Sequence, residues 1–315
     1  MSRTLIPFLC SPHEPDAQAW LDALRAALPE AQVLPFSALG AQQRETARVA
    51  IVANPDPQEV RALPALEWVH SVWAGVERLL GELGARPLHV VRLVDPALTE
   101  AMAEAVLAWT LYLHRDMPAY AAAQREARWA PRAPVRAAAR TVSLLGCGEL
   151  GSAAAARLHA NGFTVRAWRR QPAASAHASM HHGAQGLRQM LGRTDILVCL
   201  LPLTPQTRGL LDAAHLALLP RGAALINFAR GPILDAEALR AALDEGRLSH
   251  AVLDVFDREP LPATQWEWRH PRVTVLPHVS APTDRHSASA IVARAVRAYL
   301  LRGELPPGVD RQRGY

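Results

Sequence analysis

The sequence predicts an α/β protein of two domains, each built on a parallel β-sheet that is covered by helices. Short apolar segments with strand character alternate with helical patterns, and this alternation occurs in two separate series along the chain. Half of the residues are hydrophobic, which is enough for a sizeable core. The length of 315 residues also suits about two domains.

The first series of predicted strands precedes residue 96. It consists of the segments TLIPFL (4–9), AQVLPF (31–36), RVAIVA (48–53), EWVHSVWA (67–74) and LHVVRLV (88–94). Helical patterns such as DAQAWLDALRAAL (16–28) lie between these segments. Strands that alternate with helices in this way favour a parallel sheet.

A long helical stretch and a second series of strands follow. The helical stretch covers residues 96–128, with a break near Met117–Pro118, and a proline-bearing loop comes after it. The second series is RTVSLLG (140–146), FTVRAW (163–168), DILVCLL (195–201), AALINFA (223–229), HAVLDVF (250–256) and VTVLP (273–277). A final helix covers residues 284–301. We expect both long helices to cross between domains, so that residues 108–283 form a domain inserted into one made of residues 1–107 and 284–315.

Composition excludes several classes of function. The chain has no lysine, so all 34 basic residues are arginine, and neither Schiff-base chemistry nor a P-loop lysine is available. The formal net charge is +5, but the arginines are scattered among acidic residues, so we expect no nucleic-acid partner.

Cysteine usage and hydropathy indicate a cytoplasmic protein. Cys10, Cys147 and Cys199 are far apart and odd in number, which favours neither a disulfide framework nor a zinc site. The N-terminal segment lacks a signal-peptide cleavage site. No apolar stretch is long enough to span a membrane, so no membrane association is expected.

Gly146, Gly148 and Gly151 form a G-x-G-x-x-G pattern between a predicted strand and a predicted helix. The first glycine permits a tight turn, the second lets the backbone approach a pyrophosphate, and the third lets the helix pack closely on the strand. The helix N-terminus supplies N–H groups and the positive end of the helix dipole. A plain tight turn in a parallel sheet is the other interpretation, but the strand–loop–helix–strand context favours a Rossmann-like dinucleotide site.

Arg169 and Arg170 close the strand that follows the glycine loop. An acidic residue at this place would bind a ribose 2′-hydroxyl, whereas an arginine accommodates a 2′-phosphate. A guanidinium can bind a phosphate through two hydrogen bonds. The pair therefore predicts NADP(H) as the cofactor, with NAD(H) as a weaker alternative. Two ordinary surface arginines remain the other interpretation.

Three later strands are followed by polar side chains that suit the reduction of a 2-oxo acid. Arg230, Glu259 and His278 each follow a strand, and ligands of open α/β sheets gather at the carboxyl ends of strands. An arginine can bind the substrate carboxylate, and a histidine can donate a proton to the carbonyl oxygen. A glutamate on the far ring nitrogen would orient the imidazole and favour its protonated form.

With these motifs, the sequence resembles the D-isomer-specific 2-hydroxy acid dehydrogenase family over nearly the whole chain. The stretches that carry the resemblance are LLGCGELG, LLPLTPQTRGLL, NFARGPILD, LDVFDREPLP and LPHVSA. The segments SVWAGVERLL, EAMAEAVLAW, WEWRHPRVTVLPH and VDRQRGY bring it nearest to the bacterial glyoxylate/hydroxypyruvate reductase A group.

The resemblance implies a role for each domain and a set of site residues. Residues 1–107 and 284–315 would form a flavodoxin-like substrate-binding domain, and residues 108–283 an NADP-binding Rossmann domain. Arg230 would bind the substrate, Glu259 would pair with the histidine, His278 would donate the proton, and Asp254 would contact the nicotinamide amide. The further cofactor residues would be Gly146, Gly148, Glu149, Leu150, Gly151, Trp168, Arg169, Arg170, Leu201, Pro202, Thr207 and Ala229.

The substrate carboxylate would be held by a loop in the first domain. The backbone amides of Ala74, Gly75 and Val76 are the expected donors. Trp73 stands where the family usually has a second glycine. It would either narrow the pocket towards small oxo acids or pack in the core of the domain.

Three other features stay open or carry little weight. His177, His181 and His182 are close in sequence, but they lie in a predicted connecting loop without a third ligand, so no metal site is expected. Cys147 either fills a gap in the glycine loop or responds to oxidation. Trp129 either packs in the core or, by the resemblance, reaches the site of a second subunit.

These observations together predict a cytoplasmic NADPH-dependent reductase of glyoxylate and hydroxypyruvate that acts as a homodimer. Two alternatives remain. One is an NAD(P)-dependent dehydrogenase of another small 2-hydroxy acid. The other is a nucleotide-sensing binding protein of the same fold, similar to the transcriptional corepressors of the family.

Overall fold

The computed structural model describes residues 3–11, 14–84 and 86–311. The chain divides into two compact units, one of Met1–Leu98 and Thr283–Tyr315 and the other of Thr99–Pro282. The second unit is therefore an insertion into the first. The division at 98/99 lies nine residues before the expected one at 107/108, because most of the helix that begins at Pro96 packs in the second unit. Part of VDRQRGY (309–315) lies outside the described residues.

The first unit contains a five-stranded sheet in which all the pairs are parallel. Its strands are β1 (Thr4–Cys10), β2 (Ala31–Pro35), β3 (Val49–Ala53), β4 (Trp68–Ser71) and β5 (His89–Val91). The order β2-β1-β3-β4-β5 is the flavodoxin-like order. The helices of this unit are α1 (Ala17–Ala27), η1 (Phe36–Ala38), α2 (Ala41–Thr46), α3 (Pro57–Arg61), α4 (Glu77–Leu83) and α11 (Arg285–Arg302).

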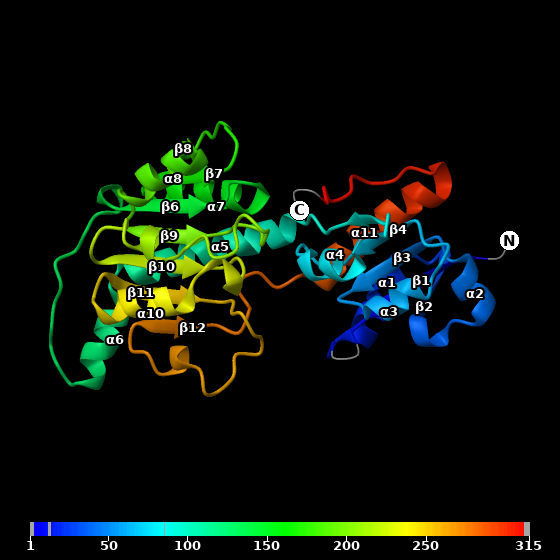
Figure 1. The fold of residues 1–315 in the computed structure, drawn as a ribbon, viewed down its shortest axis with the longest axis horizontal. Helices are drawn as coiled ribbons and strands as arrows, with labels where there is room; N and C mark the ends of the chain where they lie inside the picture. The colour runs from blue at the N-terminus through cyan, green and yellow to red at the C-terminus, as the bar shows by residue number, and fades with distance from the viewer. Residues whose placement is uncertain (1–2, 12–13, 85, 312–315) are drawn as a thin grey trace. The chain divides into compact units, whose positions relative to one another are not determined.

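Helices cover both faces of this sheet (Figure 1). One hydrophobic cluster joins the sheet to α1 and α11, and a second joins it to α3 and α4. All five residues of β3 are buried, as expected for a central strand of a parallel sheet that is covered on both sides.

The second unit contains a seven-stranded parallel sheet in the order β12-β11-β10-β9-β6-β7-β8. Its strands are β6 (Thr141–Leu145), β7 (Thr164–Arg169), β8 (Ser179–His182), β9 (Ile196–Cys199), β10 (Ala223–Asn227), β11 (Leu248–Leu253) and β12 (Val273–Val275). Counted from β6, this is the Rossmann order with one further strand at the edge. The predicted fold class is confirmed.

Helices cover both faces of this sheet as well (Figure 1). The helices of this unit are α5 (Pro96–His114), α6 (Met117–Arg125), η2 (Ala137–Ala139), α7 (Glu149–Ala160), α8 (Gly183–Leu191), α9 (Ala213–Leu216), η3 (Gly231–Ile233), α10 (Ala236–Asp244) and η4 (Trp266–Trp268). The long helical stretch breaks at Asp116, whose φ of 56° is left-handed, just before the predicted Met117–Pro118. None of the helices in the described part of the chain has the length and apolar character to cross a membrane.

One element differs from the expectation. The segment around His181 and His182, predicted as a connecting loop, contains β8, which pairs with β7 along its whole length. Its sequence SMHH has no hydrophobic alternation, so the pairing with β7, rather than its own pattern, makes it a strand.

Candidate active site

The glycine loop joins the end of β6 to the beginning of α7. Gly146 has a φ of 100°, and a Cβ there would approach the Leu200 carbonyl oxygen to 2.9 Å, so glycine is required. The N–H of Gly146 donates to the Trp168 carbonyl oxygen at 2.9 Å, which holds the loop against the end of β7. The loop therefore lies at the carboxyl end of two adjacent strands.

The other two glycines leave the helix N-terminus accessible. A Cβ on Gly151 would overlap the backbone of Gly146, whereas a Cβ on Gly148 would meet nothing within 4 Å. Gly148 caps α7 without a side-chain hydrogen bond, and the N–H groups of the first turn have no partner inside a helix. Glu149 is exposed and Leu150 is half-buried in that turn. This cradle fits a pyrophosphate.

The end of β7 presents two cations. Arg169 and Arg170 are both exposed, and neither has an ion pair or side-chain hydrogen bond with another described residue. Trp168 is instead buried, and its indole N–H donates to the Gly183 carbonyl oxygen at 2.8 Å. The side chain of Trp168 is therefore held within the protein, whereas Arg169 and Arg170 are available to bind an anion.

The loop after β9 is held by its own threonines. The hydroxyl of Thr207 donates to the Pro202 carbonyl oxygen at 2.7 Å and accepts from the N–H of Thr204 at 2.8 Å. Leu201 is buried in the core at the start of this loop. These contacts fix the loop beside the glycine loop, since β9 is the neighbour of β6.

Arg230 follows β10, and its backbone is fixed on both sides. The buried amide of Asn227 accepts from the N–H of Ala229 at 3.2 Å and donates to the Arg230 carbonyl oxygen at 3.3 Å. Gly231 packs so closely that a Cβ there would overlap the backbone of Phe256. The guanidinium donates to the Ala229 carbonyl oxygen at 2.7 Å.

Glu259 and His278 follow the next two strands of the sheet, β11 and β12, and are joined directly. The Nδ1 atom of His278 lies 2.7 Å from Oε2 of Glu259, and Oε1 of Glu259 accepts from the N–H of Phe256 at 2.8 Å. The side chain of His278 is 53% exposed, so its other ring nitrogen is accessible to a ligand. Because β10, β11 and β12 are neighbours, Arg230, Glu259 and His278 lie at one edge of the sheet.

The hydrogen bond between His278 and Glu259 shifts the pKa of both side chains towards their charged forms. The hydrogen bond to Glu259 raises the pKa of His278 above its ordinary value, against burial and the nearby Arg230, which lower it. Burial acts to raise the pKa of Glu259, but the hydrogen bonds from His278 and Phe256 outweigh it and leave that pKa lowered. The arrangement therefore favours an imidazolium beside a carboxylate.

Asp254 holds the backbone that carries His278. Its two carboxylate oxygens accept from the N–H groups of Val279 and Ser280, at 2.7 and 2.9 Å. His278 has a φ of 55°, a left-handed conformation that is unfavourable for a residue with a Cβ, so its backbone needs such support. The family resemblance implies a nicotinamide contact for Asp254, and sequence reasoning missed this supporting role, for which an acidic residue at a strand end is the only local signal.

In the first unit, residues 73–76 follow β4 as a short loop. Its backbone N–H groups at Ala74, Gly75 and Val76 donate no hydrogen bond to any residue in the described ranges, which suits an anion-binding loop. The hydroxyl of Ser71, which the sequence analysis did not select, accepts from the N–H of Trp73 at 3.0 Å and fixes the entry to the loop.

Trp73 packs against the core of its own unit. Its ring lies edge-on to Trp20 with centroids 5.3 Å apart, in the cluster that joins the sheet to α1 and α11. The core-packing alternative for Trp73 accounts for these contacts.

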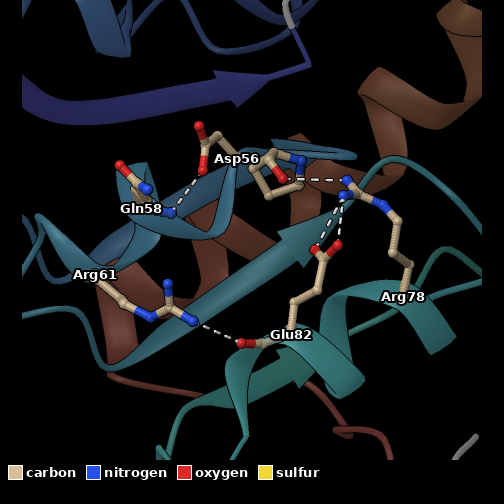
Figure 2. Close-up of polar contacts among 6 residues, drawn as sticks. Asp56, Gln58, Arg61, Arg78 and Glu82 are labelled. Atoms are coloured by element: carbon tan, nitrogen blue, oxygen red, sulfur yellow. Dashed lines mark hydrogen bonds and ion pairs between the residues drawn. The ribbon is translucent and has the colours of Figure 1, made fainter.

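The far end of the loop is anchored by α4 (Figure 2). Arg78 donates to both carboxylate oxygens of Glu82, at 2.9 and 3.0 Å, and to the Pro55 carbonyl oxygen at 3.1 Å. Arg61 of α3 donates to the Glu82 carbonyl oxygen at 3.0 Å. These hydrogen bonds connect α4, which begins directly after the 73–76 loop, to the segment that follows β3.

No group of three or more His, Cys, Asp or Glu side chains within the described residues is arranged to hold a metal ion. Cys147 is buried, with its sulfur 3.6 Å from the Ser152 hydroxyl, which agrees with a packing role.

A family model and several solved structures match this chain. Residues 107–280 match the family model described as D-isomer specific 2-hydroxyacid dehydrogenase, NAD binding domain. A D-isomer specific 2-hydroxyacid dehydrogenase from Xanthobacter autotrophicus Py2, in complex with NADPH and MES, is 39% identical over 100% of both chains, with a TM-score of 0.91.

Two further structures are similar over almost the same length. The NADPH-dependent glyoxylate/hydroxypyruvate reductase SmGhrA from Sinorhizobium meliloti, in complex with NADP and sulfate, is 33% identical and has a TM-score of 0.90; the match covers 99% of this chain and 100% of that one. A probable 2-hydroxyacid dehydrogenase from Rhizobium etli CFN 42, in complex with NADP, HEPES and L(+)-tartaric acid, is 30% identical with the same coverages and a TM-score of 0.89. The chain therefore belongs to the D-isomer specific 2-hydroxyacid dehydrogenase family of oxidoreductases.

Proposed function

We propose that the protein is an NADPH-dependent reductase of small 2-oxo acids, which converts glyoxylate to glycolate and hydroxypyruvate to glycerate. The observation that carries the proposal is the hydrogen bond between His278 and Glu259, in the same unit as the glycine loop and at the same sheet edge as Arg230. The similarity to SmGhrA supports this choice of substrates.

Each residue has a distinct task in this reaction. NADPH, when bound, supplies the hydride that reduces the carbonyl carbon. His278 holds a proton on its accessible ring nitrogen and donates it to the carbonyl oxygen, while Glu259 keeps the ring oriented and protonated. Arg230 binds the substrate carboxylate through its planar guanidinium.

The preference for NADPH rests on Arg169 and Arg170. Both are exposed at the end of β7, beside the glycine loop, and neither is neutralised by an acidic partner in the described residues. They are suited to bind the 2′-phosphate, which a carboxylate at this place would repel. A discrimination of about 100-fold in kcat/KM over NADH requires only about 2.7 kcal/mol.

The test is to follow oxidation of NADPH and NADH with a panel of 2-oxo acids that includes glyoxylate and hydroxypyruvate. We expect turnover of both named substrates and a higher kcat/KM with NADPH. Arg169→Asp should raise the KM for NADPH steeply and leave turnover with NADH intact.

Three outcomes would contradict parts of the proposal. Absence of turnover with every oxo acid would favour a nucleotide-sensing binding protein of the same fold. Turnover of another oxo acid alone would favour a dehydrogenase of a different small 2-hydroxy acid. Equal use of NADH and NADPH would mean that the two arginines are ordinary surface residues.

We also propose a homodimer. Trp129 is 97% exposed in the segment between α6 and η2, and Val135 in the same segment and Tyr120 on α6 are exposed as well. A fully exposed tryptophan with apolar neighbours is typical of a protein interface. Closed two-fold dimers are the commonest soluble assemblies.

A further inference from the structure

The histidines of β8 lie beside the cation pair that ends β7. β8 is parallel to β7, and the register places Trp168 opposite His181 and Arg169 opposite His182. Adjacent strands are about 4.8 Å apart, and partners in a parallel ladder project to the same face of the sheet. His182 and Arg169 are thus direct neighbours at the carboxyl end of the sheet.

The two histidines project to opposite faces. His181 lies on the face of Trp168 and α8, where its Nε2 is 3.3 Å from a guanidinium nitrogen of Arg166. His182 lies two residues after Met180 in β8, so both side chains project to the same face of the sheet. Met180 packs with Ala167 in the hydrophobic cluster that α7 covers. His182 and Arg169 therefore share the face of α7, the helix whose N-terminus the glycine loop opens.

His182 is also available to a ligand. It is exposed, and its side chain makes no hydrogen bond or ion pair with any other residue in the described part of the chain. It is the N-cap residue of the nine-residue helix α8 but does not cap that helix with its ring. The positive end of the α8 dipole adds to the field of Arg169 and Arg170.

We propose that His182 is a third residue of the 2′-phosphate site and helps to select NADPH over NADH. The proposal rests on the NADPH preference proposed above. An imidazole offers an N–H donor in both its neutral and its charged form, so it can bond one phosphate oxygen while the neighbouring guanidinium binds others. The three donors would be Arg169 and Arg170 at the end of β7 and His182 at the end of β8, two adjacent strands that are joined by a loop.

A purely structural role for His182 predicts a different behaviour. If the ring only supported the edge strand or the start of α8, its removal would affect ligands with and without the 2′-phosphate equally. The two roles can therefore be separated with a ligand pair that differs by that phosphate alone.

The experiment measures binding of 2′,5′-ADP and 5′-AMP to the full chain by calorimetry, for the wild type and for His182→Ala, His182→Arg and His177→Ala. The matched control is His177, another exposed histidine nearby, which lies before β8 rather than opposite Arg169. We expect His182→Ala to lower the affinity for 2′,5′-ADP by about 5- to 20-fold, which is the effect of losing one charge-assisted hydrogen bond that is partly screened by solvent. Binding of 5′-AMP should change less than twofold, and His182→Arg should restore that of 2′,5′-ADP.

Steady-state kinetics give the second readout. His182→Ala should raise the KM for NADPH by a similar factor and leave the KM for NADH and for glyoxylate unchanged. Unchanged affinity for 2′,5′-ADP, or an equal loss for both nucleotides, would overturn the role of His182 even if the enzyme reduces glyoxylate with NADPH. Conversely, a selective loss of 2′,5′-ADP binding without any oxo acid turnover would support the role of His182 and contradict the proposed reaction.

Discussion

The hydrogen bond between Nδ1 of His278 and Oε2 of Glu259, 2.7 Å long, joins the loops that follow two adjacent strands of one sheet. It fixes the imidazole on one side and leaves the other nitrogen accessible, because the histidine side chain is 53% exposed. It also raises the pKa of His278, so the proton donor is charged over a wider pH range than a free histidine would be.

Replacing His278 with alanine removes the proposed proton donor. We expect kcat for glyoxylate reduction to fall by about 10²- to 10⁴-fold, the usual contribution of a positioned general acid. The KM for NADPH should stay within about twofold, since the glycine loop is untouched. Steady-state kinetics and a cofactor titration check both values, and a loss of cofactor binding would point to a folding defect instead.

Replacing Glu259 with glutamine should change the pH profile of the reaction. Reduction requires protonated His278, so kcat/KM falls as pH rises through its raised pKa. Glutamine removes the carboxylate that raises this pKa, so the descending limb should move to lower pH. The oxidation of glycolate requires the neutral ring and should move in the same direction. A pH profile identical to that of the wild type would contradict the pairing.

Replacing Asp254 with asparagine should loosen the support of His278. The carboxylate accepts from both Val279 and Ser280, whereas an asparagine has one acceptor and would turn an N–H donor towards the other amide. We expect kcat to fall about tenfold or more and the pH limb to move lower, because the charge of Asp254 also raises the pKa of His278. Normal kcat with a normal pH profile would exclude this role.

Replacing Gly231 with alanine tests the packing that fixes the Arg230 loop. The added Cβ would overlap the backbone of Phe256 and Asp257, so either the loop or its neighbour must shift. We expect a loss of stability of about 1–3 kcal/mol, typical of overpacking, together with a higher KM for the oxo acid. Gly148→Ala is a steric control for stability, because a Cβ there meets nothing within 4 Å. Equal unfolding midpoints for the two variants would contradict the prediction.

Replacing Trp129 with glutamate should weaken the proposed dimer. The side chain is 97% exposed in the single chain, so the change should leave the fold of each protomer intact. Light scattering at micromolar concentration should give a dimer for the wild type and a smaller mass for the variant. A monomeric wild type would refute the proposed assembly.

The sequence alone determined the fold class and the principal motifs. The strands that precede Gly146, Arg230 and Glu259 are short segments rich in apolar residues, and such local patterns indicate both the element and the position of the residues that follow it. The spacing of Gly146, Gly148 and Gly151 predicted the turn, and Gly146 and Gly151 each meet a local steric requirement there.

Only the tertiary structure decided the position of His182, the bonds of Asp254 and the packing of Trp73. β8 is a polar segment that becomes a strand through its pairing with β7, so no periodicity could place His182 opposite Arg169. Asp254 reaches the amides of Val279 and Ser280 across a loop, and Trp73 meets Trp20 from another element. These contacts join residues that are distant in sequence, and a local pattern carries no information on which distant partners a strand or side chain will meet.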